Sequence, residues 1–184
     1  MVDHPGRSDD LPLPLARAPL PGELSVELSW ASVGESSELA ALEAASYPAD
    51  EAASEAVIRA RIEQAPRCFL VAREAGALLG FVNGTRSAER RLRHAAMSSH
   101  DPTGVSLCVH SVVVAPERRR EGLGSRLLAE YLERTRALEG VEQVLLISKE
   151  HLLDFYRAAG FELVGPSEVV AGRDPWFEMR RVLA

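Results

Sequence analysis

The residues with the greatest potential for chemistry follow one another in one stretch, VVVAPERRREGLGSRLLAEYL, at positions 112–132. It runs from β-branched residues through three arginines and two glycines into a leucine-periodic helix. The first amide groups of a helix have no partner within the helix, and the helix dipole adds partial positive charge there. Gly122 and Gly124 would let a phosphate approach the backbone closely. The stretch predicts an anion site, although a solvated arginine surface beside a glycine turn is an equal alternative on these residues alone.

The glycine spacing and the net charge limit which anion is possible. No Gly-Lys-Ser/Thr follows, as the Walker pattern requires, and the third glycine of the dinucleotide fingerprint is missing. The net charge of −6 repels nucleic acid, so any anion must be held locally. The pattern therefore favours another phosphate-bearing ligand and argues against a nucleic-acid partner.

Three further residues are candidates for proton transfer or nucleophilic attack. His110 lies in the apolar run before the arginines and suits a proton acceptor near neutrality, although a hydrogen-bonded core histidine is favoured for that residue alone. Cys108 shares its strand face, where burial would raise the pKa of the thiol and favour packing. Tyr156 is either a proton donor or, beside Phe155, part of an aromatic core. No metal is expected, because no Cys/His metal spacing occurs.

The elements that must position these residues form one domain. Residues 1–22 hold five prolines and no aromatic residue, which predicts a disordered tail before a domain at residues 23–184. No stretch is apolar enough to cross a membrane, and the N-terminus lacks a signal-peptide pattern. We therefore expect a cytoplasmic protein with reduced cysteines and no membrane partner.

The hydrophobic pattern predicts an α/β fold, with a mixed sheet of about seven strands and helices on both faces. Strands are expected at residues 24–30, 67–73, 77–85, 105–115, 141–148, 161–164 and 176–182, and helices at residues 34–47, 50–65, 123–138 and 151–158. Asp50 is expected to cap the second helix, and residues 74–76 to close a hairpin. The polar segment 86–104 predicts a long loop or lid. A helix between two buried strands predicts that the strands at 105–115 and 141–148 are parallel.

Two motifs carry a resemblance to a known family. Arg119, Gly122 and Gly124 match the R/Q-x-x-G-x-G/A signature of the GNAT superfamily of N-acetyltransferases, and DFYRAAGFELVG resembles its later helix and last hairpin. The segments YPADEAAS, HSVVVAPERRREGLG, FYRAAGF and WFEM resemble the arylalkylamine (serotonin-type) N-acetyltransferases. Within that group the resemblance is greatest to the non-vertebrate forms, because the helix after Pro48 is several residues longer than in the animal pineal enzyme. The similarity covers residues 24–184. It implies a GNAT fold and transfer of acetyl from acetyl-CoA to a small arylalkylamine, by direct attack in a ternary complex.

The resemblance also implies roles for individual residues. His110 occupies the second position of the family's His-x-His and would be the base, whereas Cys108 replaces the first histidine. Tyr156 would protonate the leaving thiolate. Pro48, Cys108 and Trp176 would contact the amine. The acetyl-CoA site would comprise the backbone of Val112, Val113 and Val114 along the pantetheine arm, and Arg119, Arg120, Glu121, Gly122, Leu123, Gly124 and Ser125 around the pyrophosphate.

Other functions remain open from the sequence. A polyamine or another small amine is the nearest alternative, favoured by Asp50 and Glu51, although acids are common at helix N-termini anyway. A CoA-binding module with weak turnover is conceivable because of Cys108. We expect no 14-3-3-type regulation, because the segment LARAPLPGE lacks Ser and Thr. We also expect a monomer or weak dimer.

Overall fold

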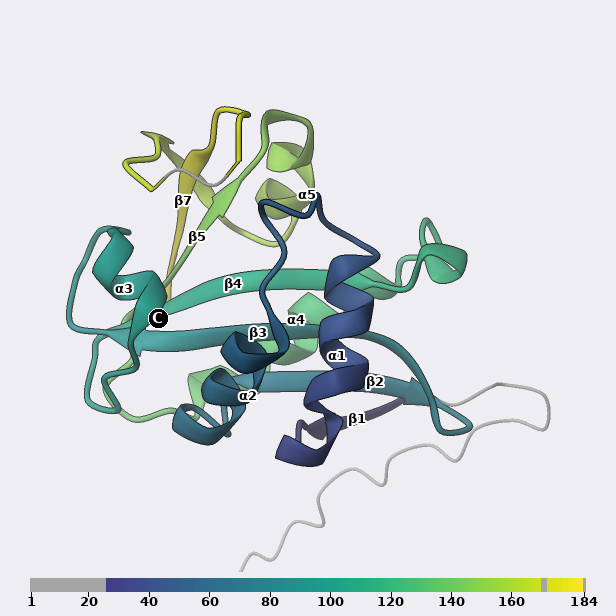
Figure 1. Cartoon of the computed structure of the whole chain (residues 1–184). Helices are drawn as coiled ribbons and strands as arrows, with labels where there is room; N and C mark the ends of the chain where they lie inside the picture. Colours follow the sequence, from purple (N-terminus) through teal and green to yellow (C-terminus); the bar gives the residue numbers. More distant parts are fainter. Residues whose placement is uncertain (1–25, 170–171, 184) are drawn as a thin grey trace, which may run out of the picture.

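A computed structural model describes residues 26–169 and 172–183 as a seven-stranded sheet with helices on both faces (Figure 1). The strands are β1 (Glu27–Trp30), β2 (Phe69–Glu74), β3 (Ala77–Ser87), β4 (Ser106–Val114), β5 (Gln143–Ser148), β6 (Glu162–Pro166) and β7 (Phe177–Val182). Their order is β1-β2-β3-β4-β5-β7-β6, in which β4 and β5 are parallel and every other neighbouring pair is antiparallel. The predicted mixed α/β sheet is confirmed. The predicted tail at residues 1–22 lies outside the described residues.

The helical segments lie on two sides of this sheet (Figure 1). They are η1 (Val33–Glu35), α1 (Ser36–Ala44), α2 (Glu55–Gln64), α3 (His94–Ser98), η2 (Pro116–Arg118), α4 (Leu123–Arg136), η3 (Glu150–Leu152) and α5 (Leu153–Ala158). Phe69 and Val71 of β2 pack with α1 and α2, whereas Leu70 and Ala72 belong to the cluster that contains α4. The two-residue alternation of a strand therefore supplies two cores, one on each face.

Helix α4 presents one apolar side to the sheet, as its leucine spacing predicts. Its buried residues are Leu123, Leu127, Leu128, Tyr131, Leu132 and Thr135. The hydroxyl of Tyr131 donates to the Cys68 carbonyl at 3.0 Å. A Cβ on Gly84 would lie 2.7 Å from that hydroxyl oxygen, so the close approach of α4 to β3 requires glycine there. The helix ends at Arg136, slightly earlier than expected.

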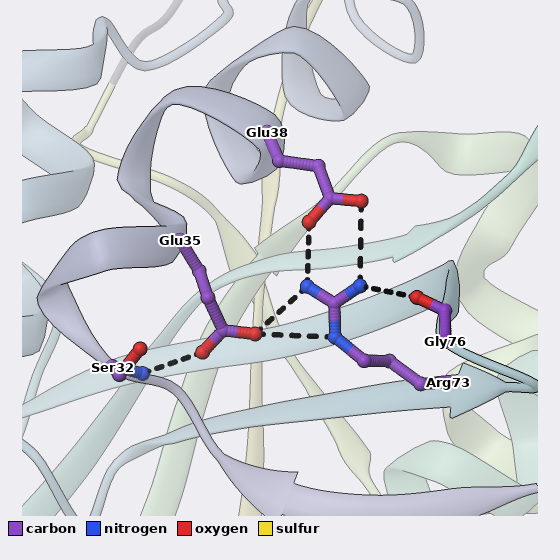
Figure 2. A network of polar contacts seen from close by, with 5 residues as sticks. All are labelled: Ser32, Glu35, Glu38, Arg73 and Gly76. Atoms are coloured by element: carbon purple, nitrogen blue, oxygen red, sulfur yellow. Dashed lines mark hydrogen bonds and ion pairs between the residues drawn. The ribbon is translucent and has the colours of Figure 1, made fainter.

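A network of ion pairs joins α1 to the sheet (Figure 2). The Arg73 guanidinium on β2 donates to Glu35 Oε1 at 2.8 Å and to Glu38 Oε2 at 2.5 Å. It also donates to the Gly76 carbonyl at 2.8 Å, in the turn between β2 and β3. Hydrogen bonds to these carboxylates, to Glu38 first, raise the pKa of Arg73. The network fixes α1 over β2, and α1 contributes to the site described below.

One predicted local structure differs from the observed one, and a second is confirmed. The N-cap of α2 is Ser54, whose Oγ accepts from the Val57 amide, and Asp50 lies in the preceding turn. The prediction of Asp50 as the cap was wrong, because the amides of Glu51 and Ala52 bind the Pro48 carbonyl and close a separate turn. The hairpin at residues 74–76 is confirmed, with Ala75 and Gly76 both at positive φ.

Residues 86–104 are more ordered than the predicted loop or lid. The segment contains α3, and the buried carboxylate of Glu178 on β7 accepts from Arg91 Nε at 2.9 Å and from the Leu92 amide at 3.1 Å. Within the segment, His100 Nδ1 near the end accepts from the amide of Arg86 at the start, at 3.0 Å. The contacts of Arg91 and Leu92 depend on β7, which lies about ninety positions later in the chain, so periodicity within the segment gave no signal for them.

Candidate active site

The site begins where β4 and β5 separate. Their parallel pairing ends at Val109 and Leu146, and the two strands diverge beyond that point (Figure 1). On the other side of β4, Asn83 pairs with Ser111 and Gly84 with Val109, so His110 is the extra residue of a β-bulge. Within the described residues, no strand pairs with positions 110–114 on the β5 side. A bulge and an open strand edge therefore coincide in the middle of the sheet.

Two cavities meet at this separation. The first, here called the glycine-loop cavity, has a volume of about 540 Å³ and runs along β4 to the start of α4. The second, here called the β5-side cavity, has a volume of about 450 Å³ and lies between α1, the bulge and the end of β5. Both are lined by Ser46, Tyr47, Val112, His151, Leu152 and Tyr156. A group transferred between ligands in the two cavities would pass this shared wall.

The glycine-loop cavity has the geometry of an anion site. Gly122 is the N-cap of α4 with a φ of 78°, and Arg120 has a φ of 64°. Turns with positive φ at a helix start direct backbone amides toward one point, where the helix dipole also favours negative charge. Arg119 Nε donates to the Val114 carbonyl at 3.1 Å, and its Nη2 donates to Ser46 Oγ at 3.3 Å. These contacts hold the Arg119 side chain along the cavity wall.

Most of the residues predicted for acetyl-CoA line this cavity. They are Val112, Val113, Val114, Arg119, Arg120, Gly122, Gly124 and Ser125. The other two do not line it, because the Leu123 side chain is buried in the core and Glu121 forms an ion pair with Arg118 at 2.9 Å. Arg118 itself lines the cavity and is fixed by Glu74 at 2.7 Å.

His110 lies in the β5-side cavity with one ring nitrogen engaged and one free. Its Nε2 lies 2.8 Å from Thr85 Oγ1, and its Nδ1 is buried without a hydrogen-bond partner among the described residues. Burial, and then the charge of Arg61, hold the pKa of His110 well below its usual 6.5. The imidazole is therefore neutral near pH 7, the form that can accept a proton.

Tyr156 forms part of the shared wall and is 8% exposed. Its ring makes edge contacts with Phe155 and Phe161, at centroid distances of 4.9 and 5.9 Å. Burial, and then Tyr47, raise the pKa of the Tyr156 hydroxyl. The hydroxyl therefore keeps its proton and can donate a hydrogen bond to a group in either cavity.

The three residues expected to contact the amine are not all brought together. Pro48 and Trp176 line the β5-side cavity. Cys108 is fully buried beside Leu92 and Leu145 and lines neither cavity. Burial first, and then Glu178, raise the pKa of its thiol to about 12, so the packing role is favoured over contact with an amine.

A polar cluster on α1 was missed from the sequence. Glu43 Oε1 accepts from Ser111 Oγ at 2.8 Å and from the Ala53 amide at 3.4 Å, while its Oε2 is buried without a described partner. Burial raises the pKa of Glu43. Tyr47 lies beside it, and burial and then Glu43 raise the pKa of that phenol. The one signal for Glu43 was its position four residues after Leu39, on the buried side of the helix.

Two further charged residues, Glu51 and Lys149, line the β5-side cavity. Lys149 Nζ lies 2.7 Å from Glu51 Oε1, 2.9 Å from Asp174 Oδ2 and 5.2 Å from the centroid of the Trp176 ring.

Among residues 26–169 and 172–183, no three Cys, His, Asp or Glu side chains are grouped so as to hold a metal ion. In the same residues, no helix is long and apolar enough to cross a membrane.

Solved structures share this architecture. The loading GNATL domain of CurA from Lyngbya majuscula is similar with a TM-score of 0.76 and 18% identity, covering 86% of this chain and 98% of that chain. A phosphinothricin acetyltransferase from Sinorhizobium meliloti, solved in complex with AcCoA, is similar with a TM-score of 0.65 and 23% identity, covering 86% and 89%. At these identities the likeness shows a GNAT fold.

Sequence comparison identifies the family. The family model for the acetyltransferase (GNAT) domain matches residues 37–183, so the chain belongs to the GNAT acetyltransferase family. Serotonin N-acetyltransferase of Mesocricetus auratus is 31% identical over 107 residues, which are 58% of this chain and 52% of that protein. The chain thus spans about half the length of the curated relatives it matches. The serotonin-type resemblance of the sequence agrees with this finding.

Proposed function

We propose that the protein transfers the acetyl group of acetyl-CoA to the primary amine of a small arylalkylamine, by direct attack in a ternary complex. The observation that carries this proposal is the meeting of the two cavities at Tyr156. One cavity leads to the anion-binding geometry at the start of α4, and the other contains the neutral His110. Such a pair of cavities can hold a thioester and an amine in contact.

Acetyl-CoA fits the glycine-loop cavity in charge and in backbone pattern. The pyrophosphate would lie against the first amides of α4 and beside Arg119 and Arg120. The pantetheine arm would extend β4 by strand-like hydrogen bonds along Val112 to Val114, where no described strand pairs on the β5 side and the Val114 carbonyl also accepts from Arg119. Membership of the GNAT acetyltransferase family supports this ligand.

The chemistry needs a neutral amine and a protonated donor for the leaving group. An alkylamine with a pKa near 10.4 is almost entirely ammonium at neutral pH, so a proton must leave before attack. Neutral His110 would take that proton, directly or through water. The amine nitrogen then bonds to the thioester carbon, the carbon–sulfur bond breaks, and the Tyr156 hydroxyl stabilises or protonates the departing thiolate.

The acceptor would pack its apolar part in the β5-side cavity. Trp176 supplies an aromatic wall, and Met97, Ile147 and Val169 supply aliphatic surface. The similarity to serotonin N-acetyltransferases supports an aromatic amine. Diamines and polyamines are the second candidate class, favoured by the buried carboxylate of Glu51 in the same cavity.

A free-thiol release assay with acetyl-CoA tests the proposal. Tryptamine, serotonin, phenylethylamine and spermine would be compared for the wild type, His110→Ala and Tyr156→Phe. We expect turnover on the aromatic amines, with kcat lowered roughly 10²–10⁴-fold in His110→Ala, the range of general base catalysis. Tyr156→Phe should lower kcat with little change in KM, because the leaving group is stabilised in the transition state. CoA binding without thiol release on any amine would contradict the proposal.

A further inference from the structure

The β5-side cavity contains a buried carboxylate that the proposed acetyl transfer does not use. Glu51 lies in the turn after Pro48, ahead of the α2 cap, and its side chain is 4% exposed. Its Oε1 accepts from Lys149 Nζ, whereas its Oε2 is buried with no hydrogen-bond partner among the described residues. A buried carboxylate oxygen without a donor costs free energy. A donor supplied by a ligand in the cavity would remove that cost.

The charges around Glu51 favour a cation as that donor. Lys149 is shared between Glu51 and Asp174, so this group of three, here called the Glu51 cluster, has a net charge of −1. The other buried carboxylate of the cavity, Glu43, is attracted to the buried guanidinium of Arg61. Asp174 is 64% exposed and does not line the cavity, so what the cavity itself offers a cation is the unpaired Oε2 of Glu51, whose partner Lys149 is shared with Asp174.

Glu51 and Lys149 do not belong to the wall that the two cavities share. Glu51 and Lys149 line the β5-side cavity alone, whereas the attacking nitrogen must reach the wall shared with the glycine-loop cavity, at Tyr156. Trp176 and Ile147 line the same cavity as the cluster. An acceptor that spans the cavity would place an apolar body against these residues, its reacting amine at one end and its other end at Glu51.

We propose that Glu51 Oε2 binds a second, non-reacting cationic group of the acceptor. The inference rests on the proposed acetyl transfer and adds a preference among its acceptors, for amines with a positive charge at the other end of an apolar body, aliphatic or aromatic. Lys149 holds Glu51 in place by occupying Oε1 and leaves Oε2 for the ligand. A carboxylate at that end of the acceptor is disfavoured by the net negative charge of the cluster.

Two acceptors that differ at the far end alone provide the test. Hexylamine is compared with its analogue that carries a dimethylamino group at the other end, which is cationic and forms no stable amide. The readout is the ratio of their kcat/KM values, measured by thiol release from acetyl-CoA. We expect the wild type to prefer the dimethylamino compound about tenfold, the size of one charge-assisted hydrogen bond. The variant Glu51→Gln should bring the ratio close to one.

Two further variants separate recognition from structure. Asp50→Asn removes the same charge from the neighbouring exposed residue, which lines neither cavity, and should keep the wild-type ratio. Lys149→Met removes the competing cation and should raise the ratio. If Glu51 acts through its ion pair with Lys149 alone, Glu51→Gln and Lys149→Met will change the ratio in the same direction, which overturns the inference. Should Glu51→Gln fail to fold, the direction of the Lys149→Met change decides.

The outcomes also distinguish this inference from the proposed function. Thiol release without a preference for the second cation, or a preference that survives in Glu51→Gln, overturns this inference alone. No thiol release with any amine overturns the proposed function and this inference together.

Discussion

Among the single residues, the proposed acetyl transfer depends most on a histidine that stays neutral. Burial and Arg61 lower the pKa of His110, so above 6.5 it is already the base. We expect kcat/KM for the amine to stay nearly constant from pH 6.5 to 9, because neutral His110 and the ammonium form of the acceptor both predominate over that range. Stopped assays from pH 6.5 to 9 measure this. An inflection near pH 6.5 in the profile of kcat/KM would contradict the lowered pKa of His110.

The same shift has a consequence for stability. His110 binds a proton more tightly in the unfolded chain than in the folded protein, so falling pH below 6.5 favours unfolding until the folded pKa is reached. When the pH is lowered from 7 to 5, the Tm of His110→Gln should therefore fall less than the Tm of the wild type. His94→Gln, at an exposed position on α3, is the matched control and should follow the wild type.

The sequence indicated some site residues and not others. His110, Tyr156 and the two glycines were indicated by local motifs, and each of them lines at least one of the two cavities. Glu43 and Tyr47 were missed because their contact with Ser111 depends on how α1 lies over the bulge. Cys108 was expected beside the amine, but its side chain points into a small core behind the cavity.

Among the helices and strands, α4 must begin at an unobstructed turn if acetyl-CoA is to bind there. A Cβ on Gly124 would lie 3.4 Å from Val114 Cγ2 and 3.8 Å from Phe155, so a small side chain fits but projects into the glycine-loop cavity. We expect Gly124→Val to fold and to weaken acetyl-CoA binding at least tenfold, by removing the close approach of phosphate to the backbone. Isothermal titration calorimetry measures the Kd.

A control variant and one contradicting outcome complete this prediction. Ser125→Ala, next to Gly124 and without added bulk, is the control and should change the Kd less. An unchanged Kd in a folded Gly124→Val protein would show that the phosphates do not lie at this helix start.

Elements with strong internal periodicity could be predicted, and those set by distant contacts could not. The strand, helix and strand from β4 to β5 follow from β-branched runs and leucine spacing. The cap of α2 was placed at Asp50 because that residue type suits a cap, whereas the turn at Pro48 moves the helix start to Ser54. Order in residues 86–104 comes from Glu178 on β7.

At the scale of the whole molecule, the sheet order brings the two cavities together. The strand β7 lies between β5 and β6, so the C-terminal segment delivers Trp176 to the cavity that α1 closes from the other side. The sequence predicted a mixed sheet but not this order, because partner choice among strands is a non-local property. The separation of β4 and β5 also coincides with the bulge at His110, which local alternation does not reveal.

The central claim is that an acetyl group passes between ligands in the two cavities without an enzyme-bound intermediate. Its most direct test is incubation of the protein with tryptamine and acetyl-CoA carrying a carbon-13 acetyl group, followed by mass spectrometry of the small molecules and the intact protein. We predict labelled N-acetyltryptamine and a protein of unchanged mass. A labelled protein, or bound CoA with no labelled amide from tryptamine or any other amine of the panel, would contradict the account.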